Sequence, residues 1–161
     1  MNGNLITVTD AGNTATYTWN TRNQLTGITG PGFAASFAYD SLGRRTRKTI
    51  QGVTTNFVYD GLNPVQEKVG ATVTANLLTG LGIDEFLTRT DGVGSRALLT
   101  DALSSTVALG DSTGTLQTQY TYEPFGYASQ TGQANTNSYK YTGREDDGSG
   151  LYYYRARYYH P

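Results

Sequence analysis

Apolar and polar residues alternate along most of the chain, in short runs separated by turn-forming residues. The run LITVTDAGNTATYTW alternates on both sides of residues 10–13, and STVALGDSTGTLQTQYTY does so around residues 111–114. Successive side chains of a strand point to opposite faces, so a period of two predicts half-exposed β-strands. Helical periodicity is nearly absent, and its best candidate is a short turn of helix near residues 101–105.

An aromatic residue followed by a turn-forming polar residue recurs along the chain. The pairs are Trp19-Asn20, Tyr39-Asp40 and Tyr59-Asp60, spaced by twenty residues, with a divergent fourth copy at Tyr122-Glu123. Each copy predicts a strand, a turn and a returning strand, with Gly supplying the positive φ of the turn, as at Gly43. A single hairpin is marginally stable in water, whereas several side by side bury a continuous sheet face. The pattern therefore predicts an all-β protein of antiparallel hairpins.

The composition agrees with this fold class and excludes several functions. Only 37% of the residues are hydrophobic, whereas Gly (20) and Tyr (13) are abundant and suit turns and half-exposed strands. The net charge of −1 provides no electropositive surface for nucleic acid. Without Cys, a disulfide, a thiolate metal site or a Cys nucleophile is excluded. We expect no cofactor and no metal.

The start of the chain and its apolar runs bear on localisation. MNGNLITVTD has neither the basic region nor the apolar core of a signal peptide, and no run approaches the length of a membrane span. We expect an extracellular or secreted protein that is exported within a larger parent chain or by a dedicated secretion system.

Four segments now point to a family. FAYDSLGRRTRKT and NFVYDGLNPVQEK resemble YD repeats of the Rhs type. ALLTDALSSTVALGDSTGTLQTQYTYEPFGY resembles the segment that precedes the end of the Rhs core. YKYTGREDDGSGLYYYRARYYHP is similar to the Rhs repeat-associated core signature, a long and contiguous match.

The resemblance implies a long β-sheet that spirals into a hollow shell. In bacterial Rhs proteins and the related component of insecticidal toxin complexes, the shell encloses a variable toxin that lies C-terminal to the core, and animal teneurins use a related shell in adhesion. A DPxG-type motif after the core signature forms an aspartyl autoprotease in the bacterial family. This sequence contains no DPxG motif and far fewer repeats than a closed shell needs, so autoproteolysis is not expected of it.

The resemblance also gives a plan for the chain as one unit, a partial Rhs-type shell with a curled, spiralling sheet. The plan assigns residues 1–70 to YD repeats, 71–127 to connecting hairpins, 128–138 to a flexible loop and 139–161 to the core-end signature. The residues that define the repeats are Trp19, Tyr39, Asp40, Gly43, Tyr59, Asp60, Tyr122, Pro124, Phe125 and Gly126. The residues of the core-end signature are Tyr141, Gly143, Arg144, Gly150, Tyr152, Tyr153, Tyr154, Arg155, Arg157, Tyr158 and Tyr159. None of them is predicted to be catalytic.

Candidate chemistry has a structural alternative in each case. Asp40, Asp60 and Glu123 recur in every repeat, which favours turn capping over acid–base catalysis. The acidic run at residues 145–147 lacks the alternating spacing of a calcium loop, so a solvated turn is favoured. The basic stretch RRTRK, residues 44–48, is expected to be a solvated strand that discourages edge pairing, with an anionic polysaccharide as the alternative ligand. His160, the only His, is next to the last residue and is not expected to be catalytic.

The stretch LYYYRARYYHP, residues 151–161, is predicted to be one closing strand. Leu151, Tyr153 and Arg155 would share one face with Arg157 and Tyr159, and the intervening residues would lie on the other. Arg beside Tyr permits cation–π stacking.

The sequence thus favours a structural shell fragment of an Rhs-type polymorphic toxin system, which encapsulates or presents a C-terminal toxin and is not an enzyme. Its expected partners are that toxin or further Rhs repeats. Two alternatives stay open. One is a self-assembling extracellular β-protein that forms homo-oligomers through its open sheet edges. The other is a module that binds cell-surface glycans through Tyr-rich faces.

Overall fold

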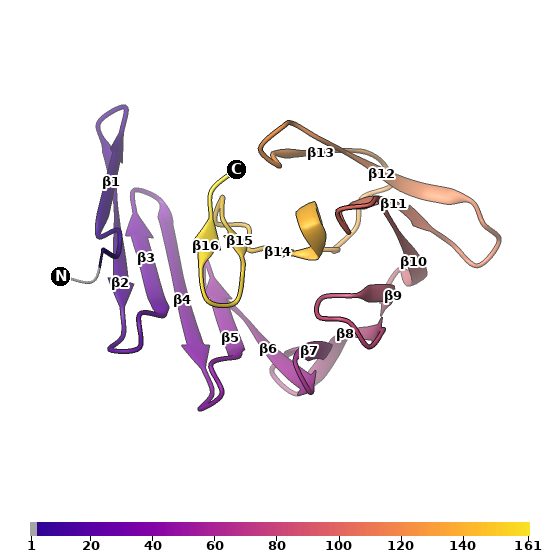
Figure 1. Cartoon of the computed structure of the whole chain (residues 1–161), viewed down its shortest axis with the longest axis horizontal. Coiled ribbons are helices and arrows are strands. Elements are labelled where there is room, and N and C mark those ends of the chain that lie inside the picture. The colour runs from indigo at the N-terminus through magenta and orange to yellow at the C-terminus, as the bar shows by residue number, and fades with distance from the viewer. Residues whose placement is uncertain (1–2) are drawn as a thin grey trace.

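The computed structural model describes residues 3–161, and nearly all of its regular structure is β-sheet. Thirteen strands follow one another as an antiparallel meander that curls without closing on itself (Figure 1). The strands are β1 (Thr7–Asp10), β2 (Asn13–Trp19), β3 (Leu25–Gly30), β4 (Phe33–Tyr39), β5 (Arg45–Ile50), β6 (Val53–Asp60), β7 (Asn63–Val69), β8 (Thr72–Thr79), β9 (Phe86–Asp91), β10 (Gly94–Thr100), β11 (Thr106–Gly110), β12 (Leu116–Tyr122) and β13 (Ala128–Gly132). The predicted all-β fold of curled antiparallel hairpins is confirmed.

One five-residue turn recurs and sets the register of the sheet. In each copy the first N–H donates to the fifth carbonyl, and the fourth N–H donates back to the first carbonyl. The copies span residues 20–24, 40–44, 101–105, 111–115, 123–127 and 140–144. The fourth residue has a positive φ each time, for example 85° at Gly43 and 94° at Gly126, which explains why Gly is frequent there. The first four turns are accompanied by a bulge in the adjoining strand pair.

The first side chain of the turn caps it where that side chain is Asn or Asp. Oδ1 of Asp40 accepts hydrogen bonds from the N–H groups of Leu42 (3.0 Å) and Arg44 (2.9 Å). Asn20, Asp101 and Asp111 accept the equivalent pair of bonds in their own turns. The turn at residues 101–105 is thus a capped turn, so the short helix expected there is wrong.

The aromatic residue of each repeat ties its strand to an earlier one. Nε1 of Trp19 donates to the carbonyl of Leu5 at 2.8 Å, and the hydroxyl of Tyr39 donates to that of Leu25 at 2.7 Å. Tyr59 donates in the same way to Arg45 at 3.0 Å, again fourteen residues earlier. In the divergent copy, Tyr122 donates to the carbonyl of Thr106 at 2.6 Å. The recurrent position therefore selects a large ring that ends in a hydrogen-bond donor.

Residues 139–161, which we call the core-end segment, fold back against the concave side of the sheet, its inner face (Figure 1). The segment holds the short 3₁₀ helix η1 (Tyr141–Gly143) and a second sheet of β14 (Glu145–Asp146), β15 (Tyr152–Tyr153) and β16 (Tyr158–Tyr159). The single closing strand expected for residues 151–161 is wrong. The chain reverses between Tyr154 and Arg157, whose backbones bond to each other, and Arg155 has a φ of 60°.

The expected flexible loop at residues 128–138 also differs from the structure. Its first half is β13, the edge strand that pairs with β12. Its second half is fixed by side chains: Oδ1 of Asn135 accepts a hydrogen bond from the hydroxyl of Tyr120 at 2.7 Å, and buried Asn137 donates to the carbonyl of Tyr139 at 2.8 Å. Turn-forming composition alone did not distinguish this fixed connection from a mobile one.

Buried apolar residues form two clusters, and the core-end segment contributes to both. The first cluster contains Leu25, Ile28, Ala35, Phe37 and Leu151. The second contains Leu77, Phe86, Leu98, Leu109, Tyr120 and Tyr139. Leu151 and Tyr139 belong to the core-end segment, so each half of the sheet completes its core with a residue from it. No helix among the described residues is long and apolar enough to cross a membrane.

We expect Asp40→Ala to lower the free energy of unfolding by about 1–2 kcal/mol, because two turn amides and Arg44 lose their acceptor. Asp40→Asn keeps an acceptor oxygen, as Asn20 does, and should retain most of the stability. The control is Asp60→Ala, since the Asp60 side chain accepts no hydrogen bond within residues 3–161, and a change within about 0.5 kcal/mol is expected. Urea unfolding measures all three variants, and equal losses for both Ala variants would contradict the capping role.

Candidate functional site on the inner face of the sheet

The site is built around Arg45, the first residue of β5. The pairing of β4 with β5 shifts register between Ala38 and Tyr39, where Arg47 and then Arg45 are their partners. The shift breaks the simple alternation along β5. Arg45 is fully buried, with a relative exposure of 0%, whereas Arg47 is exposed. The bulge therefore directs the Arg45 guanidinium onto the inner face.

Two carboxylates of the core-end segment bind this guanidinium. Nη1 and Nη2 of Arg45 donate to the two carboxylate oxygens of Asp147 at 2.7 and 2.6 Å, and Nη2 also donates to Glu145 at 2.6 Å. Lys48 donates to the other oxygen of Glu145 at 2.6 Å. Two positive and two negative side chains thus form a charge-balanced group, which we call the Arg45 cluster. A buried charge persists only when it is paired in this way.

The Arg45 cluster overturns two expectations from the sequence. The stretch at residues 44–48 is not simply a solvated strand, because Arg45 is buried and Lys48 is half-buried. The acidic run at residues 145–147 is not a solvated turn, because Glu145 and Asp147 are both buried. Each stretch by itself has the composition of a surface segment, and its partner of opposite charge lies a hundred residues away.

Aromatic rings surround the Arg45 guanidinium, which is not exposed to solvent. The guanidinium carbon of Arg45 lies 3.9 Å from the ring centroid of Tyr153 and 5.1 Å from that of Phe37. The hydroxyl of Tyr158 accepts a hydrogen bond from Nη1 of Arg45 at 3.0 Å and lies 2.9 Å from the hydroxyl of Tyr39. Rings of the repeats and rings of the core-end segment therefore share one cation.

The electrostatics of the cluster follow from its burial and its pairing. Burial alone would raise the pKa of the Glu145 carboxyl, but Lys48 and Arg45 outweigh it and hold that pKa below its ordinary value. Burial would likewise lower the pKa of Lys48, but Glu145 and Asp147 keep it raised. Both residues are thus held in their charged forms, as the short hydrogen bonds require.

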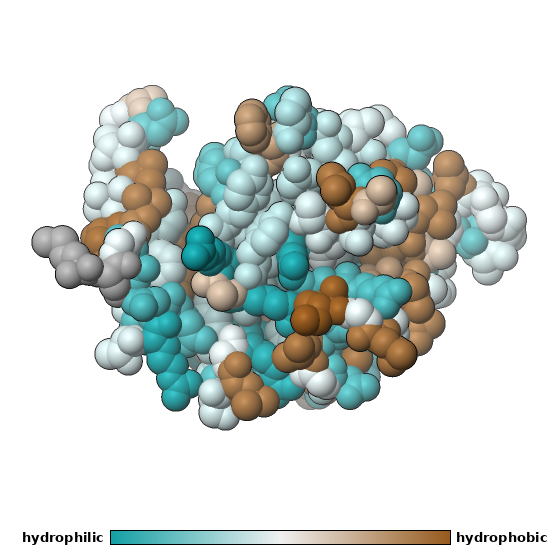
Figure 2. All heavy atoms as spheres, in the orientation of Figure 1, coloured by the Kyte–Doolittle hydropathy of each residue, from teal (hydrophilic) through white to brown (hydrophobic). Residues whose placement is uncertain are grey.

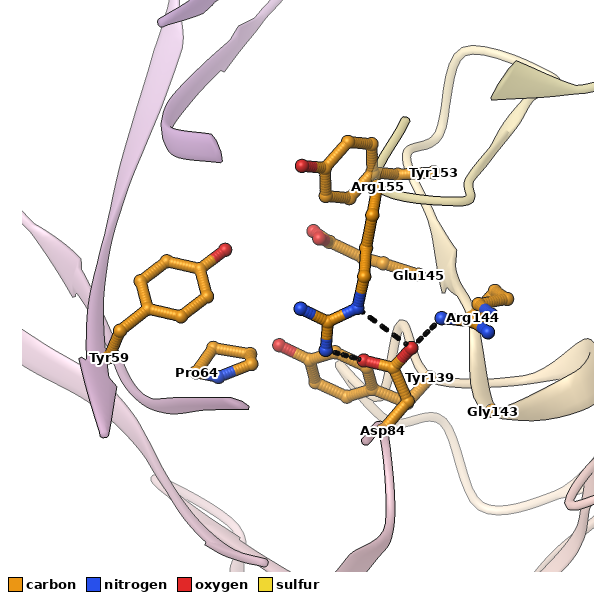
Figure 3. Close-up of a pocket in the computed structure, with 9 residues that line it drawn as sticks. All are labelled: Tyr59, Pro64, Asp84, Tyr139, Gly143, Arg144, Glu145, Tyr153 and Arg155. Carbon is orange, nitrogen blue, oxygen red and sulfur yellow. Dashed lines mark hydrogen bonds and ion pairs between the residues drawn. The ribbon is translucent and has the colours of Figure 1, made fainter. Parts of the chain in front are cut away.

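A second anchor joins the core-end segment to the turn between β8 and β9. The carboxylate of Asp84 forms ion pairs with both Arg144 and Arg155 (Figure 3). Arg155 also donates to the carbonyl of Leu62 at 2.7 Å, and Asn63 accepts a hydrogen bond from the Asp84 amide at 2.9 Å. The cavity beside these residues, about 20 Å³, is far smaller than the pocket of a metabolite-binding site.

A third anchor lies where the core-end segment begins. The ring of Tyr139 stacks on that of Phe86 at a centroid distance of 3.9 Å, and its hydroxyl donates to Glu67 at 3.2 Å. Both oxygens of Glu67 also accept hydrogen bonds from Arg89, each at 2.9 Å. Burial raises the pKa of the Tyr139 hydroxyl well above its ordinary value, which keeps it protonated as a donor.

A fourth anchor uses the turn at residues 123–127. The hydroxyl of Tyr152 donates to the carbonyl of Gly126 at 3.1 Å, and that of Tyr159 donates to Phe125 at 2.7 Å. A Cβ on Gly126 would lie 2.4 Å from the ring of Tyr141, and its φ is 94°. Glycine is therefore required there by close approach as well as by backbone conformation.

The structure brings most of the predicted signature residues together at these anchors. Tyr39, Gly126, Tyr141, Arg144, Tyr152, Tyr153, Arg155, Tyr158 and Tyr159 all take part in contacts between the sheet and the core-end segment. The hydroxyl of Tyr154 bonds to Thr142 within the segment at 2.6 Å. Pro124 and Arg157 are exposed, and Gly150 has a φ of 81° in a turn.

Sequence reasoning missed the charged partners: Arg45, Lys48, Glu67, Asp84, Arg89, Glu145 and Asp147. One signal was available for Arg45. Twenty residues earlier, the equivalent position of the preceding repeat is Leu25, a core residue with 1% exposure. When one repeat has a charged residue at a position that is apolar and buried in the preceding repeat, a buried partner of opposite charge is predicted.

A separate open groove of about 740 Å³ lies between the first strands and the core-end segment. Tyr17, Trp19, Leu25, Leu151 and Tyr158 are among the residues that line it. Its lining mixes these aromatic and apolar side chains with the polar residues Asn23, Arg157 and His160, and it adjoins the first apolar cluster. Among the described residues, no group of three or more His, Asp or Glu side chains is arranged to hold a metal ion, in this groove or elsewhere.

The fold and these anchors define a β-repeat protein whose curled sheet holds its own C-terminal segment on the inner face. A family model described as RHS Repeat matches residues 1–32. A curated relative, the toxin subunit YenC1 of Yersinia entomophaga, is 43% identical over 56 residues, which is 32% of this chain and 6% of the relative.

Solved structures share the fold. The TcdB2-TccC3 crystal structure matches 91% of this chain and 9% of its own, with a TM-score of 0.69 and 21% identity. TcdB2-TccC3-Cdc42 matches with a TM-score of 0.71 and 22% identity over 91% of this chain and 8% of its own. The chain thus spans less than a tenth of each of these relatives. The chain therefore contains a segment that matches the RHS repeat, and it shares its fold with these solved structures.

We expect Arg45→Met to lower the free energy of unfolding by about 3–5 kcal/mol, because Glu145 and Asp147 would remain buried without their shared cation. The control is Arg47→Met on the same strand, whose exposed side chain predicts a change within about 0.5 kcal/mol. Chemical unfolding followed by circular dichroism measures both. If the two variants lost the same stability, the Arg45 cluster would not be holding the segment.

Alkaline pH provides a second test, through the buried tyrosines. Burial raises the pKa of Tyr153 to about 12 and raises those of Tyr59, Tyr152 and Tyr158 as well. A raised folded pKa means that the stability is complete below the ordinary value of 10.0 and is lost as the pH rises beyond it. We expect tyrosinate absorbance and loss of sheet signal to appear together above that pH.

Tyr153→Phe keeps the ring and removes one titrating group, so its stability should decline less steeply with alkaline pH than that of the wild type. The measurement is the slope of unfolding free energy against pH. An unchanged slope, or tyrosinate formation near pH 10 with the sheet intact, would show that these hydroxyls are not buried in solution.

Proposed function

We propose that this chain is a wall segment of an Rhs-type toxin protein, in which the curled sheet encloses or presents a toxin that follows the core-end signature. The observation that carries the proposal is the anchoring of residues 139–161 to the inner face of the sheet by the Arg45 cluster. A flat binding module would not need to place its core-end segment inside its own curve.

The geometry supports the enclosing role over a surface role. Four anchors hold the core-end segment from β5 to the turn before β13, so the segment fixes the curvature of the sheet. The family resemblance implies a toxin C-terminal to this signature. A toxin in that position would begin on the concave side, where a longer array of repeats would surround it.

The proposed role is structural and not catalytic. The charged groups of the Arg45 cluster and the pair of Asp84 with Arg155 are bound to one another on the inner face. The proposed partners are the following toxin and further Rhs repeats. Export as part of a larger parent protein is proposed for the same reason, since the relative that shares 43% identity is a toxin subunit.

The test expresses the reading frame that contains this chain, together with whatever upstream and downstream sequence it encodes. We expect additional YD repeats upstream and a variable domain downstream, and we expect that domain to resist added protease while the repeats are folded. Arg45→Met should make the downstream domain protease-sensitive, whereas Arg47→Met should not. A downstream domain that is cleaved equally in all three proteins would contradict enclosure.

A further inference from the structure

Lys48 of β5 and Glu145 of β14 bring an amine and a carboxyl group into contact away from water. Nζ of Lys48 lies 2.6 Å from Oε1 of Glu145, and the two side chains are 15% and 7% exposed. The ring of buried Phe57 lies beside the same amine, with its centroid 5.8 Å from Nζ. Strongly hydrophilic side chains ordinarily lie on the surface, as the teal atoms of Figure 2 show. A buried amine held against a carboxyl group has the reactants of an amide bond in place.

The two oxygens of the Glu145 carboxyl group have different partners. Oε2 accepts a hydrogen bond from Nη2 of Arg45 at 2.6 Å, whereas Oε1 accepts one from Lys48. A guanidinium bound to one carboxyl oxygen stabilises the negative charge that develops there when an amine adds to the carboxyl carbon. Oε2 is therefore placed to become the carbonyl oxygen of an amide, and Oε1 is placed to leave.

Asp147 provides a neighbouring group that can carry a proton. Nη2 of Arg45 donates to Oδ1 of Asp147 at 2.6 Å as well as to Glu145, so the two carboxyl groups lie side by side. The Asp147 side chain has no exposure to solvent, and this burial raises the pKa of its carboxyl group even though Arg45 opposes the shift. A carboxylate of this kind accepts a proton from a neighbouring ammonium group more readily than an exposed one does.

We propose that Lys48 and Glu145 condense to an isopeptide bond, which joins β5 covalently to the core-end segment. The reaction starts from the ion pair. Nζ of Lys48 gives one proton to Asp147, and its lone pair then forms a bond to Cδ of Glu145. The bond from Cδ to Oε1 breaks, and Oε1 leaves as water with two protons, the one carried by Asp147 and a second from Nζ. One ammonium and one carboxylate thus become one amide and one water, without an oxidant, a reductant or a cofactor.

The charge balance of the Arg45 cluster favours this product. The ion pairs keep two positive and two negative side chains away from water, which costs hydration for each of them. Condensation removes the charges of Lys48 and Glu145 and leaves Arg45 bound to Asp147 by two hydrogen bonds. The remaining charges are still balanced, and a neutral amide is buried at a smaller cost than an ion pair.

The bond gives a chain without Cys the kind of cross-link that a disulfide provides elsewhere. It closes a loop between two residues that are 97 positions apart in the sequence. A cross-link over so long a loop lowers the entropy of the unfolded chain, and it makes the attachment of the core-end segment permanent. The inference rests on the Arg45 cluster and not on the proposed enclosure of a toxin.

A second pair of a lysine and a carboxylate provides an internal control. Lys140 donates to Asp146 at 2.8 Å, but the Asp146 side chain is 29% exposed. The other oxygen of Asp146 accepts a hydrogen bond from the backbone amide of Gly148, in the place where Glu145 has a guanidinium. This carboxylate is hydrated and lacks the activating cation, so we expect no condensation at Lys140.

The test is the mass of the denatured full chain. We expect the wild-type protein to be lighter than its sequence by one water. Trypsin should release a cross-linked species that joins residues 48–68 to residues 145–155, because an amide at Nζ prevents cleavage after Lys48. Lys48→Arg keeps the positive charge but has no amine that can attack, so it should fold, as circular dichroism checks, and have its full sequence mass. Asp147→Asn should slow the appearance of the cross-link at least about tenfold.

Loss of one water has another possible source, which the test separates. An Asp-Gly step can dehydrate to a succinimide, and the chain has three such steps, at Asp60, Asp91 and Asp147. Hydroxylamine opens a succinimide, whereas an isopeptide bond survives it. The proposal is overturned if the folded wild-type chain has its full sequence mass, or if hydroxylamine removes the mass difference. The same loss of water in Lys48→Arg, or a cross-link at Lys140 in place of Lys48, would also overturn it.

Discussion

The guanidinium of Arg45 is the constraint on which the rest of the structure depends. It is buried without exposure to solvent, so it must find compensating charge, and the only way the sheet obtains that charge is to bring Glu145 and Asp147 to it from a hundred residues away. An ion pair of this kind adds little net stability compared with apolar packing of the same volume. Its contribution is specificity: the core-end segment has one position in which both carboxylates are satisfied. The Arg45 cluster thus sets where the segment lies and how far the sheet curls.

The sheet itself is stabilised by repeated local chemistry more than by a large apolar core. With 37% hydrophobic residues, the chain has two modest clusters, each completed by a residue of the core-end segment. Between them, side-chain caps fix the turns at residues 20–24, 40–44, 101–105 and 111–115, and the aromatic donors Tyr39 and Tyr59 tie their strands to earlier ones. These bonds recur with the repeat, so the sheet extends by adding similar units.

The sequence predicted these local features well, because their causes lie within one repeat. The spacing of Tyr39 and Tyr59 and the turn residues that follow them indicated strand, turn and returning strand, and the all-β fold followed. The capping predicted for Asp40, Asp60 and Glu123 is seen only at Asp40 among these three. The site was harder to predict, because its charged partners lie far apart along the chain and each has the sequence context of a surface charge. Arg45 and Asp147 can be recognised as an ion pair only in the folded structure, where the curl of the sheet brings them together. The reversal at Arg155 was missed for another reason: its left-handed φ is imposed by ion pairs with distant residues, which no local propensity encodes.

The bulge before Arg45 has a consequence for the order of events during synthesis. The sheet precedes its core-end segment in the chain, so a ribosome releases β5 about a hundred residues before Glu145 and Asp147. During that interval the arginine has no carboxylate from the segment. Their pairing closes a loop of about a hundred residues, a non-local contact of the kind that slows folding. The single charged residue in the apolar repeat position therefore makes the completion of the first cluster depend on a distant part of the chain.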